Sequence, residues 1–287
     1  MSDPHAVPAR PPAPQLLESR FLALRPQPAP ARPRVGGRVV AIASGKGGVG
    51  KTWFAITLAH ALARGGARVL LFDGDLGLAN VDIQLGLMPE RDLSSVVSGG
   101  MTLEEAAVRH AGGFDIVAGR SGSGALSALD GVTLARVLLA LRKAAERYDY
   151  VIIDLGAGLD ATVRRMAVFA DLLLVVATEE PTSLTDAYAV LKLHAADRGA
   201  DRGSIAASEA RIVVNQAGSR TGGERTYATL ARACTAFLGH APRLAGVIRR
   251  DERVPDAIRR QTPILARHPT APAAEDVETV AAGLAGD

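Results

Sequence analysis

The sequence contains a single cysteine, Cys234, and no long apolar run. One thiol excludes an intrachain disulfide and any site that needs several thiolates from one chain. The six histidines are scattered without ligand spacing, which argues against a structural zinc site. No apolar run reaches the ~18–20 residues of a membrane-spanning helix, and residues 1–14 lack the apolar core of a signal peptide. We therefore expect a cytoplasmic protein.

An excess of positive charge is absent outside the first 34 residues. The chain has 33 basic and 30 acidic residues; five of the former and two of the latter lie in residues 1–34, so the remainder is neutral. Nine of the 16 prolines lie in the same segment, which predicts a proline- and arginine-rich flexible tail. Within it, residues 15–25 carry apolar side chains at i, i+4 and i+7 and predict a short amphipathic helix. That helix either has no fixed partner or docks on a partner protein or a membrane surface.

From residue 38 onward, short apolar runs alternate with helical patterns. Apolar strands separated by helices predict an α/β fold with a mostly parallel central sheet and helices on both faces. We expect a single domain over residues 35–268, followed by an acidic segment over residues 269–287. The expected strands are residues 39–43, 69–72, 150–154, 172–177, 212–215 and 244–248, and the expected helices are about residues 50–64, 130–147, 159–169, 182–196, 222–238 and 252–260.

A glycine-rich loop follows the first expected strand and precedes the first expected helix. Residues 45–52 match the phosphate-loop pattern Gly-x-x-x-x-Gly-Lys-Thr in the strand–loop–helix context that it requires, which predicts a P-loop NTPase domain. Glycines let successive backbone N–H groups turn toward phosphate oxygens, and the helix N-terminus adds partial positive charge. Lys51 is expected at the β- and γ-phosphates and Thr52 on Mg²⁺. The expected nucleotide-binding residues of the loop are Lys46, Gly47, Gly48, Val49, Gly50, Lys51, Thr52 and Trp53.

Trp53 is the only tryptophan and directly follows Thr52. Its backbone N–H is available to a phosphate, whereas its indole lacks the hydroxyl that would contact one. The ring packs beside the nucleotide or, with equal weight, simply fills the core among neighbouring helices.

Two of the chain's four lysines, Lys46 and Lys51, lie in this loop, against 29 arginines elsewhere. This usage favours compact ammonium groups over planar guanidinium groups at the site. Lys46 is not required by the ordinary phosphate-loop pattern, and residues 46–52 resemble the deviant Walker A motif of the MinD/ParA ATPase superfamily. The resemblance implies that Lys46 reaches across a nucleotide-sandwich dimer to the partner's phosphates. It therefore implies ATP-dependent dimerisation, with Lys46 and Lys51 among the catalytic residues.

Two carboxylates, Asp73 and Asp75, follow the expected strand 69–72. Carboxylates at the carboxyl end of a parallel strand face the crevice in which ligands bind. Asp75 is suited to position an attacking water and Asp73 to support the magnesium shell, although both also suit a turn at a strand end. Residues 73–82 resemble switch I of the same superfamily, which implies that Asp75 is the hydrolytic residue.

The apolar strand 150–154 ends in Asp154, the Walker B pattern, so Asp154 is expected to hold Mg²⁺ through water. Gly156 and Gly158 then form the expected switch II. Later in the chain, residues 213–218 lack the lysine and carboxylate of the Asn-Lys-x-Asp element that reads guanine. By resemblance Asn215 is the expected purine contact, which favours ATP over GTP; a turn at the strand end is the alternative.

The resemblance covers about residues 38–265 and is strongest to the flagellar-number regulators of the FlhG (FleN) group. The segments that carry it are residues 75–82, 85–87, 180–192 and 251–261. It implies a slow, partner-regulated ATPase that uses ATP and Mg²⁺ and controls the number or placement of flagella, or of another structure at the cell pole or division site. The implied partners are a second copy of the chain and either an FlhF-like GTPase or a flagellar transcription regulator.

The charges at the end of the chain bear on membranes and DNA. Residues 269–287 contain four acidic residues and no lysine or arginine, so an anionic leaflet repels them. We expect at most a peripheral contact with the cytoplasmic face of the inner membrane. The arginines of residues 249–260 alternate with acidic residues, which favours a solvated helix face over a DNA-binding patch. The alternatives are a ParA-type ATPase that partitions DNA or cargo and a nucleotide-binding scaffold with negligible turnover.

Overall fold

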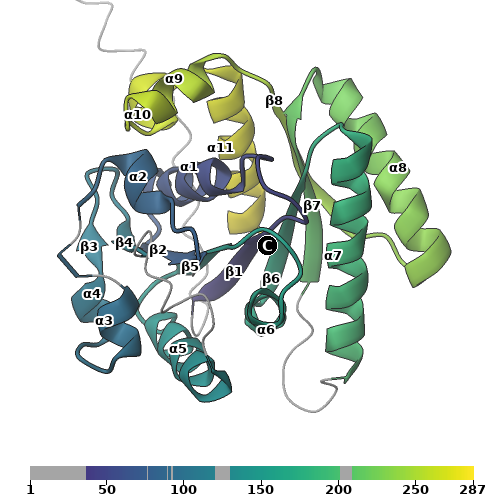
Figure 1. Cartoon of the computed structure of the whole chain (residues 1–287). Helices are drawn as coiled ribbons and strands as arrows, with labels where there is room; N and C mark the ends of the chain where they lie inside the picture. The colour runs from purple at the N-terminus through teal and green to yellow at the C-terminus, as the bar shows by residue number, and fades with distance from the viewer. Residues whose placement is uncertain (1–36, 76, 89, 92, 120–129, 201–208) are drawn as a thin grey trace, which may run out of the picture. The chain divides into compact units, whose positions relative to one another are not determined.

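The computed structural model describes residues 37–287 apart from residues 76, 89, 92, 120–129 and 201–208 (Figure 1). The helix expected over residues 15–25 lies outside the described residues. The described residues belong to one compact unit.

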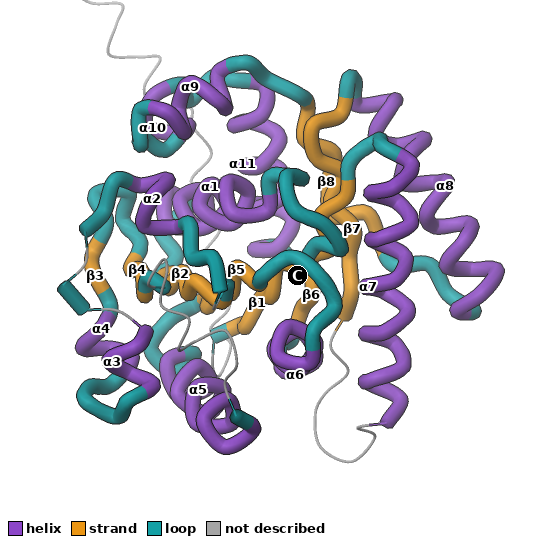
Figure 2. Tube along the Cα trace, viewed as in Figure 1, coloured by secondary structure: helices purple, strands orange, loops and turns teal. Residues whose placement is uncertain are grey.

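One sheet runs through this unit, in the strand order β3-β4-β2-β5-β1-β6-β7-β8. Every neighbouring pair is parallel except β3 and β4. Figure 2 shows the strands in orange between the purple helices. β6 is buried along its whole length because helices cover both faces of the sheet. The predicted α/β class with a mostly parallel sheet is confirmed. The strands are β1 (Arg38–Ala43), β2 (Val69–Gly74), β3 (Val108–Arg109), β4 (Asp115–Val117), β5 (Tyr150–Leu155), β6 (Leu172–Ala177), β7 (Glu209–Ala217) and β8 (Arg243–Arg249).

The helices expected from the sequence are present, with ends shifted by a few residues. They are α1 (Lys51–Arg64), α5 (Gly131–Ala144), α6 (Ala161–Phe169), α7 (Pro181–Ala200), α8 (Arg220–Leu238) and α9 (Arg253–Arg259). Several elements were not predicted, most of them too short to show a period: β3 and β4, α2 (Val81–Leu85), α3 (Leu93–Val97), α4 (Leu103–Ala106), α10 (Ile264–Arg267) and α11 (Pro272–Ala285).

The core lies in two layers, one on each face of the sheet. Successive side chains of a strand point to opposite faces. In β1, Val39 and Ala41 therefore join the cluster formed with α5 to α8, whereas Val40 and Ile42 join the cluster formed with α1 and α11. Figure 1 shows α1 and α11 on one side of the sheet and α5 and α6 on the other. The strands whose carboxyl ends carry the site loops are thereby packed on both faces.

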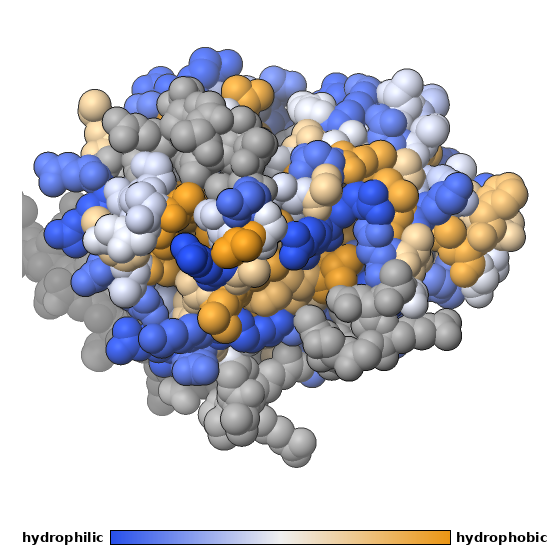
Figure 3. All heavy atoms as spheres, turned by 60° about the horizontal axis from the view of Figure 1, so that its bottom comes forward, coloured by the Kyte–Doolittle hydropathy of each residue, from blue (hydrophilic) through white to orange (hydrophobic). Residues whose placement is uncertain are grey.

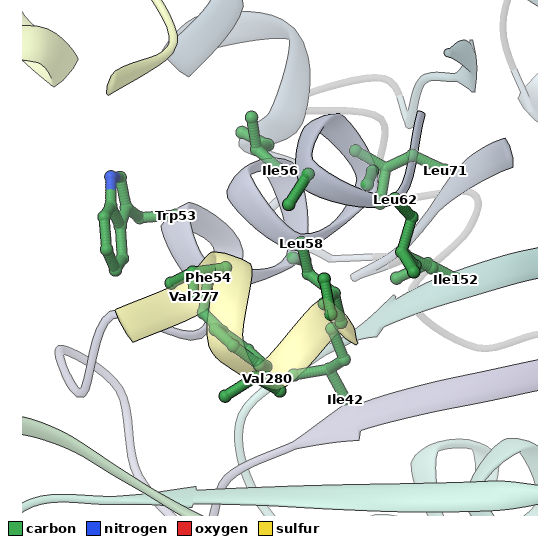
Figure 4. Packing of buried hydrophobic residues seen from close by; sticks show 14 of the residues in the cluster. Ile42, Trp53, Phe54, Ile56, Leu58, Leu62, Leu71, Ile152, Val277 and Val280 are labelled. Atoms are coloured by element: carbon green, nitrogen blue, oxygen red, sulfur yellow. The ribbon is translucent and has the colours of Figure 1, made fainter. Parts of the chain in front are cut away.

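The last helix, α11, is part of the core, although the charges of residues 269–287 predict a separate acidic segment. Its side chains Val277 and Val280 are buried in the cluster that contains α1 (Figure 4). Leu284 belongs to the same cluster. Asp276 is also buried and accepts hydrogen bonds from the backbone N–H and the guanidinium of Arg249 in β8. The structure thus joins the end of the chain to the P-loop domain.

The surface mixes hydrophilic and apolar side chains, as the face in Figure 3 shows. None of the described helices is both long enough and apolar enough to span a bilayer. Among the described residues, the exposed large apolar side chains are Leu78, Ile83, Met88, Val132, Leu139, Leu159 and Phe237.

Candidate functional site

The phosphate loop connects β1 to α1 at the carboxyl end of a central strand. Gly48 and Gly50 have φ angles of 82° and 84°, in the left-handed region that glycine adopts without steric cost. A Cβ added to Gly47 or Gly48 would meet no atom within 4 Å, so this side of the loop is open to a ligand. Gly50 is the N-cap of α1 and has no side chain to cover the first N–H groups of the helix. The loop therefore has the backbone donors of an anion site.

Lys51 and Asp154 form a buried ion pair beneath the loop. Lys51 Nζ lies 2.8 Å from Asp154 Oδ1, and the Thr52 hydroxyl also hydrogen-bonds to this carboxylate. Burial raises the pKa of Asp154, while Lys51 and Thr52 oppose that rise by stabilising the charged form. The structure thus brings together the lysine expected at the phosphates, Lys51, and two of the three expected magnesium residues, Thr52 and Asp154.

Asp73 sits beside Asp154 on the neighbouring strand, where β2 and β5 pair residue by residue. Its carboxylate accepts three backbone N–H groups of the following loop, those of Asp75, Asn80 and Val81, at 3.1 Å each. Burial, and next the Asp154 charge, raise the pKa of Asp73 to about 7 against these hydrogen bonds. Asp73 therefore holds the backbone of the loop that follows β2. Its support of the magnesium shell stays a prediction.

The residues present suit a magnesium ion, for which the Thr52 hydroxyl and the Asp154 carboxylate are hard oxygen donors. Within the described part of the chain, no group of three or more histidine, cysteine, aspartate or glutamate side chains is arranged to hold a metal by itself. Magnesium does not need one, because it is commonly held by one or two carboxylates together with waters and substrate phosphates.

Asp75, in the loop that follows β2, is partly exposed and lies beside the loop that follows β5. Asp75 Oδ1 accepts the N–H of Leu78 at 3.0 Å, within switch I. A Cβ added to Gly156 of switch II would lie 3.4 Å from the same oxygen. Gly158 donates its N–H to the carbonyl of Ser44, 3.1 Å away, at the start of the phosphate loop. The segment 156–158 therefore contacts both Asp75 and the start of the phosphate loop.

Lys46 lies on the rim of the loop and is held by the start of α7. Its Nζ is 2.5 Å from Glu180 Oε2 and 3.0 Å from Thr182 Oγ1. α7 approaches closely because Gly45 has no side chain: a Cβ there would lie 2.5 Å from the backbone of Asp186. Glu180 is a contact that the sequence did not reveal, since 134 residues separate it from Lys46.

Asn215 and Gln216, at the end of β7, contact the phosphate loop itself. Asn215 Nδ2 donates to the carbonyl of Val49 at 2.8 Å, and Gln216 Nε2 donates to the carbonyl of Gly48 at 3.3 Å. The expected purine contact of Asn215 stays a prediction, because the structure gives its amide nitrogen a partner in the loop. The sequence did not predict the contact of Gln216 with the phosphate loop; the one signal for it was the position of Gln216 next to Asn215.

Trp53 is 5% exposed and belongs to the cluster around α1. Figure 4 shows it at the start of α1, away from Leu62 and Leu71. Its indole Nε1 is buried and has no hydrogen-bond partner among the described residues. The ring fills the core within one turn of the phosphate loop.

The arginines near the end of the chain are paired with carboxylates. Arg249 binds Asp276, Arg253 binds Asp251, and Asp256 binds Arg260 and Arg267. These pairs neutralise much of the positive charge that a DNA surface would need.

Comparison with known proteins points to one family. Residues 40–264 match the family described as the CobQ/CobB/MinD/ParA nucleotide binding domain. The antiactivator FleN of Pseudomonas aeruginosa is 37% identical over 244 residues, 85% of each chain. The flagellum site-determining protein YlxH of Helicobacter pylori is 30% identical over 193 residues, which are 67% of this chain and 63% of YlxH. Among solved structures, a chain of the MinC:MinD cell division protein complex of Aquifex aeolicus superposes with a TM-score of 0.68 at 26% identity, covering 88% of this chain and 96% of that one.

Proposed function

The chain belongs to the CobQ/CobB/MinD/ParA nucleotide-binding family, and we propose that it is an ATP-binding and ATP-hydrolysing dimerisation switch of the MinD/FlhG type. The likeness to an antiactivator and to a flagellum site-determining protein supports a role in the number or placement of flagella. The observation that carries the proposal is Lys46, a second lysine at the open rim of a phosphate loop.

Nucleotide binding uses the phosphate loop and the buried pair beneath it. The N–H groups of residues 47–53 surround the phosphates, and Lys51 exchanges Asp154 for the β- and γ-phosphates. Thr52 and Asp154 would hold Mg²⁺, Thr52 directly and Asp154 through water, while Asp73 keeps the loop after β2 in place. When bound, the ion would supply positive charge that offsets the charge developing on the phosphates. Asn215 contacts the purine and favours adenine.

Hydrolysis and dimerisation involve the exposed rim of the site. Asp75 orients the attacking water and accepts its proton. Lys46 leaves Glu180 and reaches the phosphates of the partner subunit, so that the nucleotide favours the dimer. A ligand shifts such an equilibrium only through its different affinity for the two states, and ATP supplies that difference through its γ-phosphate. Turnover is slow until a partner binds.

The partners are a second copy of the chain and a regulator of flagella, either an FlhF-like GTPase or a transcription regulator. The protein acts in the cytoplasm, with at most peripheral contact with the inner membrane. A ParA-type role on DNA is less favoured, because arginines of the last third of the chain are paired with Asp251, Asp256 and Asp276.

Flagellar number tests this proposal in the organism that encodes the chain. Deleting the gene should change the number or position of flagella per cell, counted by electron microscopy. The wild-type gene should restore the normal count, whereas Lys46→Ala, expressed at the same level, should not. Normal flagella in the deletion strain would contradict the flagellar role and leave the ATPase switch to be judged on the purified protein.

A further inference from the structure

The end of β7 departs from regular strand geometry where it reaches the phosphate loop. β7 and β8 pair through Val214 with Val247, and pairing resumes only at Ala217 with Arg249. β7 thus has one more residue than β8 between these two pairs, which is a β-bulge. Within the bulge Gln216 has a φ of 56°, in the left-handed region that side-chain-bearing residues seldom adopt. Backbone of this kind is commonly found where a bulge redirects a side chain.

The bulge places two successive side chains against the same loop. In a regular strand Asn215 and Gln216 would point to opposite faces of the sheet. Here both amides donate to successive carbonyls of the phosphate loop, those of Val49 and Gly48. Asn215 also packs closely against the loop, since a Cβ added to Gly50 would lie 2.5 Å from its Nδ2.

These two hydrogen bonds orient donors on the opposite side of the loop. A trans peptide unit is planar, and its C=O and N–H point in opposite directions. Fixing the carbonyl of Gly48 therefore fixes the N–H of Val49, and fixing the carbonyl of Val49 fixes the N–H of Gly50. Because the amides of β7 hold the carbonyls, these N–H groups are turned away from β7.

We propose that Gln216, together with Asn215, is a positioning residue for the phosphate-binding backbone, through which the bulge in β7 sets the direction of the Val49 and Gly50 N–H groups. The proposal rests on the proposed nucleotide-binding function and deepens it. The pair acts on the phosphate chain of any nucleotide, whereas a purine contact acts on the base alone.

Inorganic tripolyphosphate separates these two actions because it has no base. Gln216→Met removes the amide donor but keeps the length of the side chain and adds no charge. We expect this variant to bind Mg-tripolyphosphate and Mg-ATP about two- to tenfold more weakly than the wild type in equilibrium titrations, as for the loss of one hydrogen bond. The ratio of ATP to GTP affinity should not change. KM for ATP should rise with kcat retained, since the backbone donors serve the ground state and the transition state alike.

Gln261 provides a matched control. It is also a glutamine with positive φ, 51°, and its Nε2 also donates to a backbone carbonyl, that of Ile83 at 3.0 Å, outside the phosphate loop. Gln261→Met should leave tripolyphosphate affinity unchanged. Asn215→Ala should weaken tripolyphosphate binding as well. If this substitution at a buried residue prevents folding, the tripolyphosphate affinity of Gln216→Met alone tests the positioning role.

Unchanged tripolyphosphate affinity in folded Gln216→Met would overturn the proposal, as would a change confined to the ATP-to-GTP ratio. An equal loss in Gln261→Met would also overturn it, because the effect would then not come from the loop. A wild-type protein that binds neither ATP nor tripolyphosphate would overturn the proposed function as well, and is therefore distinguishable from failure of the positioning role.

Discussion

Lys46 Nζ lies 2.5 Å from Glu180 Oε2, so the lysine that marks the deviant Walker A motif is paired within its own chain. Both side chains have exposed surface, 32% for Lys46 and 66% for Glu180. Exposed ion pairs are individually weak, because water competes for both charges. The contact therefore holds Lys46 at the rim of the site without preventing its transfer to another anion.

Lys51→Ala should weaken Mg-ATP binding by at least about tenfold, because the phosphates lose a charged donor. Trp53 lies within one turn of the loop, so its emission reports the binding. At a Mg-ATP concentration that just saturates the wild type, we expect a full emission shift in the wild type and in Lys143→Ala, a control at an exposed lysine, and a much smaller shift in Lys51→Ala. If Mg-ATP leaves the tryptophan emission of the wild type unchanged, in protein shown to bind the nucleotide, Trp53 does not report the site as a neighbour.

Asp75→Ala should bind ATP but hydrolyse it at least about a hundredfold more slowly, the usual effect of losing a group that activates water. Phosphate release in single-turnover assays measures this step directly. Asp82→Ala, at a carboxylate of the same switch region, serves as the control and should keep most of the rate. If Asp75→Ala hydrolyses ATP at the wild-type rate, another residue must position the attacking water.

His194 should make the fold sensitive to acid. It is buried, and neither ring nitrogen has a hydrogen-bond partner among the described residues. Burial, and next the charge of Arg198, lower the pKa of His194 to about 4, below its ordinary value of 6.5. The folded state then binds fewer protons than the unfolded state between these values. The stability that depends on a neutral His194 is therefore present above pH 6.5 and is lost as the pH falls toward 4.

The expected loss from His194 approaches about 3 kcal/mol over that window, since each pKa unit corresponds to about 1.4 kcal/mol. Urea unfolding at pH 7 and pH 5 measures it. His194→Leu should lose less stability between these two values than the wild type, whereas the same change at the exposed His240 should behave as the wild type does. Identical pH profiles for His194→Leu and the wild type would refute the prediction.

α11 should contribute to the stability of the whole domain. Leu284 is 2% exposed, so Leu284→Ala should lower the free energy of unfolding by about 2–5 kcal/mol through lost burial and a cavity. Leu139→Ala, at a leucine that is 72% exposed, should change it by no more than about 0.5 kcal/mol. Equal effects of the two substitutions in denaturant titrations would mean that α11 does not hold the core.

The sequence predicted those parts of the fold that a local pattern encodes. β1, β5 and β6 were recognisable because each is apolar along its length and lies between helical patterns. The sequence does not predict α11 as a core helix by charge alone, because its acidic residues favour an exposed segment. Its buried face depends on the apolar spacing of Val277, Val280 and Leu284. β3, β4 and α2 to α4 are too short for a period to appear.

The candidate site divides in the same way. The phosphate loop and Asp154 follow from a motif in its strand and helix context, and the structure brings Lys51, Thr52 and Asp154 together. The contacts of Glu180 and Gln216 depend on long-range packing and on a bulge, neither of which leaves a pattern in neighbouring residues. The hydrogen bonds of Asp73 to the backbone of the following loop likewise leave no local pattern, and its expected support of the magnesium shell stays a prediction.

Sedimentation of the hydrolysis-deficient protein tests the central claim most directly. In Asp75→Ala, saturating Mg-ATP should convert monomer to dimer, whereas Mg-ADP should leave it monomeric. Adding Lys46→Ala to the same chain should keep ATP binding but abolish the dimer, because the lysine no longer reaches the partner's phosphates. A double variant that dimerises with ATP as well as Asp75→Ala does, or an Asp75→Ala protein that binds ATP and stays monomeric, would contradict the account of an ATP-driven dimerisation switch.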